Sequence, residues 1–132
     1  MRYMLLLIGD EDQWENLSEE QVGEVLQAYE GYSRQLTEAG AFVSGEGLQP
    51  SSTSTQLRLV DGERVLTDGP FAETKEQLGG FYVLDCKDLD EALDWAEKCP
   101  AAAAGGTIEV RPVMDYEEAG YEDPRDSAEA SR

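Results

Sequence analysis

The chain has 132 residues, a formal net charge of −19 and no histidine, and these numbers exclude several classes of protein. The length fits a single domain with one hydrophobic core. Without histidine there is no Ser-His-Asp triad, no imidazole base and no histidine-bound zinc, and the two cysteines are too few for a four-thiolate zinc site. The negative charge argues against nucleic acid and anionic membrane surfaces as partners.

The N-terminal region does not resemble a targeting segment. Its apolar run, residues 3–8, is short, and acidic Asp10, Glu11 and Asp12 follow at once without a small-residue cleavage site. No stretch approaches the ~20 apolar residues of a membrane span. We therefore expect a cytoplasmic protein in which the cysteines are reduced thiols.

The first third of the chain predicts a strand followed by a helix. Residues 3–8 are continuously apolar, as in a strand buried on both faces, and residues 10–17 read as a polar loop. A helix then begins at Ser18, which can form a capping box with Gln21. Gly40 is a good C-terminal stop for that helix.

The middle of the chain predicts a second strand and a hairpin. Residues 41–48 form the strand. Residues 56–60 and 64–67 flank Asp61-Gly62, a dipeptide that favours a tight two-residue hairpin turn. The polar stretch that follows, residues 71–77, reads as a connection.

The second half repeats the strand and helix pattern. Residues 81–86 predict a strand, and Asp88 caps a helix that Pro100 ends. After a loop of small residues, residues 108–114 form the last strand, in which Pro112 indicates an edge position or a bulge.

The element order β-α-β-β(-β)-β-α-β is typical of a ferredoxin-like α+β domain, here βαββαβ with an extra hairpin. Residues 1–114 form this domain, and residues 115–132 form an acidic tail that we expect to be flexible. In this fold two helices cover one face of an antiparallel sheet. Because the strands at 3–8 and 81–86 carry large apolar residues on both faces, we predict a homodimer whose sheets pack face to face.

One charged segment is not explained by strand or helix pattern. It is DGPFAETKE, from Asp68 to Glu76. Pro70 fixes its own φ angle and restricts Gly69, so the bend between them can hold a carboxylate or a lysine–carboxylate pair in place. This segment is therefore the candidate site.

The same nine residues are the signature of the DGPFAETKE family within the YCII-related superfamily, which this chain resembles. The resemblance extends to MRYMLLLIGDE at the start, and to GGFYVLD, DLDEALDWAEKCP and EVRPVM in the second half, so it covers roughly residues 1–114. It implies a dimeric α/β barrel built from ferredoxin-like protomers.

The resemblance implies two kinds of function. Some relatives in the superfamily resemble ring-cleavage or dehydrochlorinase-type enzymes that use a His-Asp pair in a cleft of the barrel. Asp68 matches that aspartate, but this chain has no histidine to partner it. Other relatives are similar to small proteins associated with extracytoplasmic-function sigma factors, which implies a regulatory role and a protein partner.

Asp68 is the candidate catalytic residue, as an acid or base in the dimer cleft. The alternative is an Asx-turn or cap at the bend. The candidate ligand-binding residues of the same segment are Gly69, Pro70, Phe71, Glu73 and Lys75. For the lysine, a salt bridge is favoured over a Schiff-base role.

Two further candidates lie on predicted strands. If Leu57 and Leu59 face the helices, Arg58 lines the barrel interior, where it suits an anionic small molecule or neutralises Asp68. The alternative is an edge-strand charge that prevents aggregation. Tyr82 offers its hydroxyl to the cleft, or it simply packs.

No metal-ligand spacing and no dinucleotide-binding loop is present, so we expect no metal and no cofactor. The leading hypothesis is a small-molecule-binding or regulatory domain without a histidine-based site. One alternative is a small enzyme that uses Asp68 on an anionic or aromatic substrate. The other is a protein-interaction partner in sigma-factor-linked transcription regulation, which binds through its acidic surface.

Overall fold

The computed structural model describes residues 1–71 and 76–126. In chain order its elements are β1 (Arg2–Asp10), α1 (Glu11–Glu15), α2 (Glu19–Glu38), β2 (Phe42–Gly47), the 3-10 turn η1 (Ser51–Thr53), β3 (Thr55–Val60), β4 (Glu63–Asp68), β5 (Glu76–Asp85), α3 (Leu89–Lys98), α4 (Pro100–Ala103) and β6 (Thr107–Pro112).

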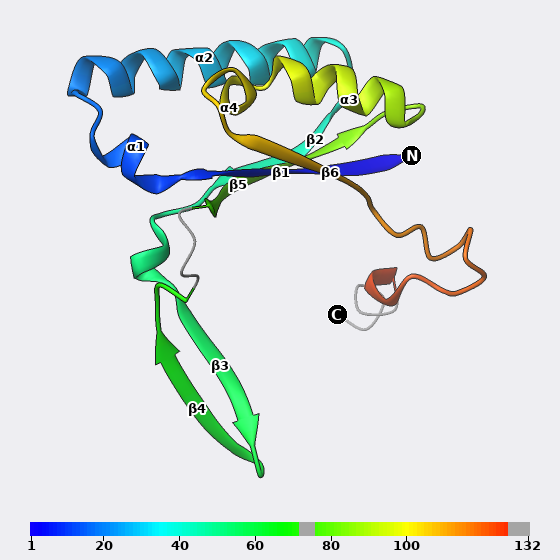
Figure 1. Cartoon of the computed structure of the whole chain (residues 1–132). Coiled ribbons are helices and arrows are strands. Elements are labelled where there is room, and N and C mark those ends of the chain that lie inside the picture. Colours follow the sequence, from blue (N-terminus) through cyan, green and yellow to red (C-terminus); the bar gives the residue numbers. More distant parts are fainter. Residues whose placement is uncertain (72–75, 127–132) are drawn as a thin grey trace.

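The body of the molecule is an antiparallel sheet of four strands in the order β2-β5-β1-β6, with α2, α3 and α4 on one face (Figure 1). The fold is α+β and ferredoxin-like, as predicted. Pro112 lies in β6, an edge strand, where a residue without an N–H group breaks no ladder on its free side.

The core lies between the sheet and the helices. Along β1, Tyr3, Leu5 and Leu7 are buried against the helices, and the side chains between them point to the opposite face. The helices contribute buried Tyr32 and Leu36 from α2, together with small residues from α3. The sheet therefore has one face that α2, α3 and α4 cover and one face that these three helices leave uncovered, which we call the open face.

Both long helices begin at the caps that the sequence predicts. The Ser18 side chain accepts a hydrogen bond from the backbone N–H of Gln21. In return, the Gln21 side chain accepts a hydrogen bond from the backbone N–H of Ser18. Asp88 caps α3 by accepting from the backbone N–H of Glu91. Gly40 follows α2 at φ +72°, a conformation that glycine adopts without strain.

Three predicted boundaries are wrong. Residues 10–17 contain α1, because Asp10 accepts from the backbone N–H of Asp12 and so starts a short helix. The helix α3 ends before Pro100 as predicted, but residues 101–106 are not all loop, because Pro100 begins α4, where the first helical turn needs no N–H from proline. The last strand before α3 begins at Glu76, not at residue 81, because its polar start pairs with the end of β1.

The predicted hairpin forms a sheet of its own. Strands β3 and β4 pair with each other through a turn at Asp61 and Gly62, both at positive φ. The hairpin, Thr55–Asp68, projects from the body on the side of the open face (Figure 1), and we call it the arm. Leu57 and Leu59 are 48% and 69% exposed, so the premise that they face the helices is wrong.

Past β6 the chain continues in hydrogen-bonded turns. The backbone N–H of Ala119 donates to the carbonyl of Asp115, and that of Tyr121 to the carbonyl of Tyr116. Within residues 1–71 and 76–126, no helix has both the length and the apolar character needed to cross a membrane. The flexibility of the tail and the cytoplasmic location stay predictions.

Candidate functional site

The DGPFAETKE segment connects the arm to the sheet. Asp68 ends β4 and Glu76 begins β5. The predicted ligand residues Glu73 and Lys75 lie outside the described residues. The described part of the motif therefore consists of its first four residues, at the base of the arm, and its last.

Hydrogen bonds order the base of the arm. The Thr55 hydroxyl donates to Oδ1 of Asp68 at 3.2 Å, and the two residues are paired across β3 and β4. The backbone N–H of Gly69 donates to the carbonyl of Ser54 at 2.7 Å. Asp68 thus accepts a hydrogen bond from a side chain, whereas in an Asx-turn its carboxylate would accept one from a backbone N–H.

A second set of bonds ties this base to the body. The backbone N–H and the hydroxyl of Ser51 each donate to one carboxylate oxygen of Glu11, both at 2.7 Å. The Ser51 carbonyl in turn accepts from the backbone N–H and the hydroxyl of Ser54. Hydrogen bonds to a carboxylate are stronger than neutral ones, so Glu11 fixes the turn on which the arm stands.

Sequence reasoning missed Glu11 and Ser51. The only signals were the serine-rich run at 51–54 and an acidic residue directly after a buried strand, and both patterns are common in loops. Their pairing joins residues 40 positions apart, which no local pattern reveals.

Gly69 is enclosed by its neighbours. A Cβ atom at this position would lie 2.8 Å from the carbonyl oxygen of Ser51, 2.9 Å from Cε2 of Phe71 and 3.0 Å from Oγ of Ser54. The peptide bond from Gly69 to Pro70 is cis. The motif therefore carries glycine here because only a residue without a side chain fits the space.

Asp68 and Arg58 lie on opposite faces of the arm. Paired residues share a face and successive residues alternate, so Asp68 shares its face with Leu57 and Leu66, whereas Arg58 shares the other face with Val65. Both are exposed. The expectation that Arg58 neutralises Asp68 is therefore wrong within one chain. Their predicted catalytic and ligand-binding roles stay predictions.

Tyr82 lies on the helix-covered face of β5 and is 9% exposed. Its hydroxyl lies 3.3 Å from Oγ of Ser33, and its ring meets the Tyr32 ring edge-on at 5.3 Å. Burial raises the pKa of Tyr82, which the hydrogen bond to Ser33 partly offsets. Tyr82 therefore packs, which was the alternative interpretation, and the residues that point to the open face are Phe81 and Val83.

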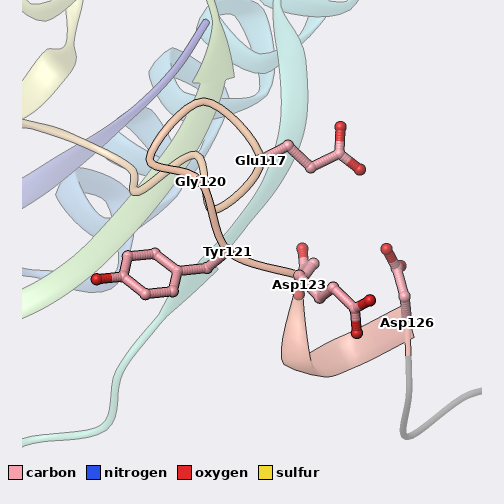
Figure 2. Close-up of a pocket in the computed structure, with 6 residues that line it drawn as sticks. Glu117, Gly120, Tyr121, Asp123 and Asp126 are labelled. Carbon is pink, nitrogen blue, oxygen red and sulfur yellow. The ribbon is translucent and has the colours of Figure 1, made fainter.

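Two shallow depressions lie beside the C-terminal turns. The first is lined by Glu117, Gly120, Tyr121, Glu122, Asp123 and Asp126. Figure 2 shows the Glu117 and Asp126 side chains on the side away from the Tyr121 ring. Hydrogen bonds from Arg125 lower the pKa of Asp123 to about 2. The second depression lies between the N-terminus and these turns, and neither is lined by Asp68 or Arg58.

In the part of the chain that the structure describes, no three cysteine, aspartate or glutamate side chains are grouped to hold a metal ion. Of the residues predicted for the site, Asp68, Gly69, Pro70 and Phe71 come together at the base of the arm. Arg58 lies on the far face of the arm, and Tyr82 lies in the core.

Fold and site together define a small ferredoxin-like α+β protein that carries its motif at the base of an arm. A model of the YCII-related domain matches residues 1–117. A protein of Rhizobium meliloti (strain 1021), described as uncharacterized, is 41% identical over 117 residues, which span 88% of this chain and 94% of that protein. The chain belongs to the YCII-related domain family, and its resemblance to that group is confirmed.

Proposed function

We propose that the protein works as a homodimer that binds a small molecule between its protomers without turning it over. The observation that carries this proposal is the open face of the sheet. Its centre consists of half-buried apolar side chains of β1 and β5: Met4, Leu6, Ile8, Phe81 and Val83. Among the described residues, α2, α3 and α4 all lie on the opposite face of the sheet (Figure 1).

The surroundings of this apolar centre fit an interface between copies of the chain. On the same face, Glu109 and Arg111 of β6 form an ion pair at 2.8 Å, and Glu46 lies on β2 at the other side. An apolar centre with a charged rim is typical of protein interfaces. A twofold axis would pair this patch with itself, so one surface serves both protomers.

Ligand binding is supported by the base of the arm. The base of the arm lies on the side of the molecule where the open face lies (Figure 1). Asp68 and, further along the chain, Phe71 are exposed there. A second copy against the open face would enclose these groups. Arg58 makes no ion pair within residues 1–71 and 76–126, in a chain of net charge −19, which supports an anionic ligand.

Binding is favoured over catalysis by the chemistry of the motif. An acid or base catalyst needs a proton-transferring group in a desolvated setting, and no histidine is present. Asp68 is exposed and accepts one hydrogen bond from Thr55. Turnover by Asp68 would require a cleft that the partner protomer alone supplies.

Analytical ultracentrifugation at micromolar concentration tests the homodimer. We expect the wild type to sediment as a dimer and Leu6→Glu, at the centre of the open face, as a monomer. Leu26→Glu is the matched control, because Leu26 is 57% exposed on α2, away from that face. A monomeric wild type overturns the proposal.

A thermal-shift screen with small carboxylates and phosphates tests the ligand. We expect at least one anion to raise the melting temperature, and we expect Arg58→Gln to abolish that rise. A rise that Arg58→Gln leaves unchanged contradicts an anion site that uses this arginine. NMR of the bound compound after incubation should show no product, and new signals would establish an enzyme instead.

A further inference from the structure

We propose that the arm docks on a second copy of this chain through its leucine face, the face that carries Leu57, Leu59 and Leu66. This inference rests on the proposed homodimer and adds which segment reaches across to the partner. It would complete the site at the arm base with residues of the second protomer.

Neither face of the arm packs against the described part of its own chain. Every residue of β3 and β4 is exposed, and in the described part of the chain these strands pair only with each other. An isolated two-stranded sheet is marginally stable in water. A hairpin with six residues in each strand therefore gains most from a surface that buries one of its faces.

The leucine face is the one with apolar area to bury. Leu57 and Leu66 form a cross-strand pair and are 48% and 59% exposed, and Leu59, two residues along, is 69% exposed. The opposite face mixes Val60 and Val65 with polar and charged residues: Gln56, Arg58, Glu63 and Thr67. Large exposed apolar patches mark interaction sites, so the leucine face is the docking surface.

The position of the arm selects a second copy as the occupant. The arm projects on the side of the open face (Figure 1), so a protomer that covers that face lies beside it. Two packed sheets lie roughly 10 Å apart, and a six-residue strand spans roughly 20 Å. The arm is therefore long enough to pass the plane of the partner's sheet.

The charges agree with this choice. Arg64 lies on the leucine face, paired with Leu59, and makes no ion pair within the described residues. The chain has 29 acidic residues, so a second copy has carboxylates that can pair with this arginine.

Matched threonine variants test the leucine face. Threonine is β-branched and favours strands, so the hairpin should persist in both variants. The first variant combines Leu57→Thr, Leu59→Thr and Leu66→Thr, and the control combines Val60→Thr and Val65→Thr on the opposite face. Unchanged far-UV circular dichroism and thermal unfolding of the body establish that each variant folds.

The dimer dissociation constant is measured by ultracentrifugation. We expect the leucine variant to raise it by at least about 100-fold, because several buried leucines are lost from each arm, and the control to change it by less than about threefold. Hydrogen exchange should show arm amides protected in the wild-type dimer and unprotected in Leu6→Glu.

The outcomes separate this inference from the proposed function. A wild-type dimer whose affinity the leucine variant leaves unchanged, with unprotected arm amides, overturns the docking of the arm and leaves the homodimer intact. A monomeric wild type overturns both. Protected arm amides in a monomer would mean that the arm packs on its own chain, which also overturns the inference.

Discussion

Replacing Gly69 by alanine should loosen the base of the arm. The new Cβ would lie 2.8 Å from the carbonyl oxygen of Ser51, a backbone atom that cannot rotate away. Either the bond from the Gly69 N–H to the Ser54 carbonyl breaks, or the turn at Ser51 shifts and weakens its two bonds to Glu11. Overpacking of this kind costs about 1–3 kcal/mol.

Hydrogen exchange followed by NMR measures this cost locally. A loss of about 1–3 kcal/mol corresponds to roughly 5- to 150-fold faster exchange of the Ser51 and residue 69 amides. Gly47→Ala is the control, because nothing lies within 4 Å of a Cβ at that position and its exchange rates should stay near those of the wild type. Rates at Ser51 that are the same in both variants would refute the reasoning.

Three further predictions concern the body of the molecule. Gly80→Ala places a Cβ 2.8 Å from the carbonyl of a neighbouring strand, so urea unfolding should show about 1–3 kcal/mol lower stability, and wild-type stability would contradict the close packing. Burial, Cys99 and Tyr82 raise the pKa of Tyr29 from 10.0 to about 12, so folding favours the neutral phenol. The contribution of Tyr29 to the free energy of unfolding should be constant below pH 10 and should decrease as the pH rises toward 12. A free energy of unfolding that increases over this range in urea titrations would contradict the raised pKa. Burial raises the pKa of the Cys86 and Cys99 thiols, so an aromatic disulfide reagent should react far more slowly with folded than with urea-unfolded protein, and equal rates would show that the thiols are accessible.

The parts of the fold that the sequence predicts are those with local causes. The capping box at Ser18 and the cap at Asp88 depend on residues three positions apart, and both are confirmed. The turn at Asp61-Gly62 depends on two residues that tolerate positive φ, and it too is confirmed.

The parts that sequence reasoning missed have distant causes. Glu76 and Gln77 look like a loop, and they become strand because Asp10 and Gly9 lie opposite them. Alternation along β5 shows that Phe81 and Tyr82 point to opposite faces, but not which face the helices cover. Tertiary packing places Tyr82 against Tyr32 and thereby decides the question.

The sequence predicts the motif of the candidate site, but not the contacts and strand pairing that position it. The fixed bend at Gly69 and Pro70 follows from residue type. The projection of the arm from the body, and with it the separation of Arg58 from Asp68, follows from strand pairing that the alternation of residues 56–60 does not reveal.

The bond between Glu11 and Ser51 bears on the order of folding. The hairpin is a local structure, and such structures form within about 1–10 μs. Its direction relative to the body depends on a contact across 40 residues, which requires that the N-terminal strand and its short helix are already in place. In a nascent chain the hairpin would therefore form first, with no fixed orientation relative to the body. The direction of its leucine face would be set only once the body has assembled.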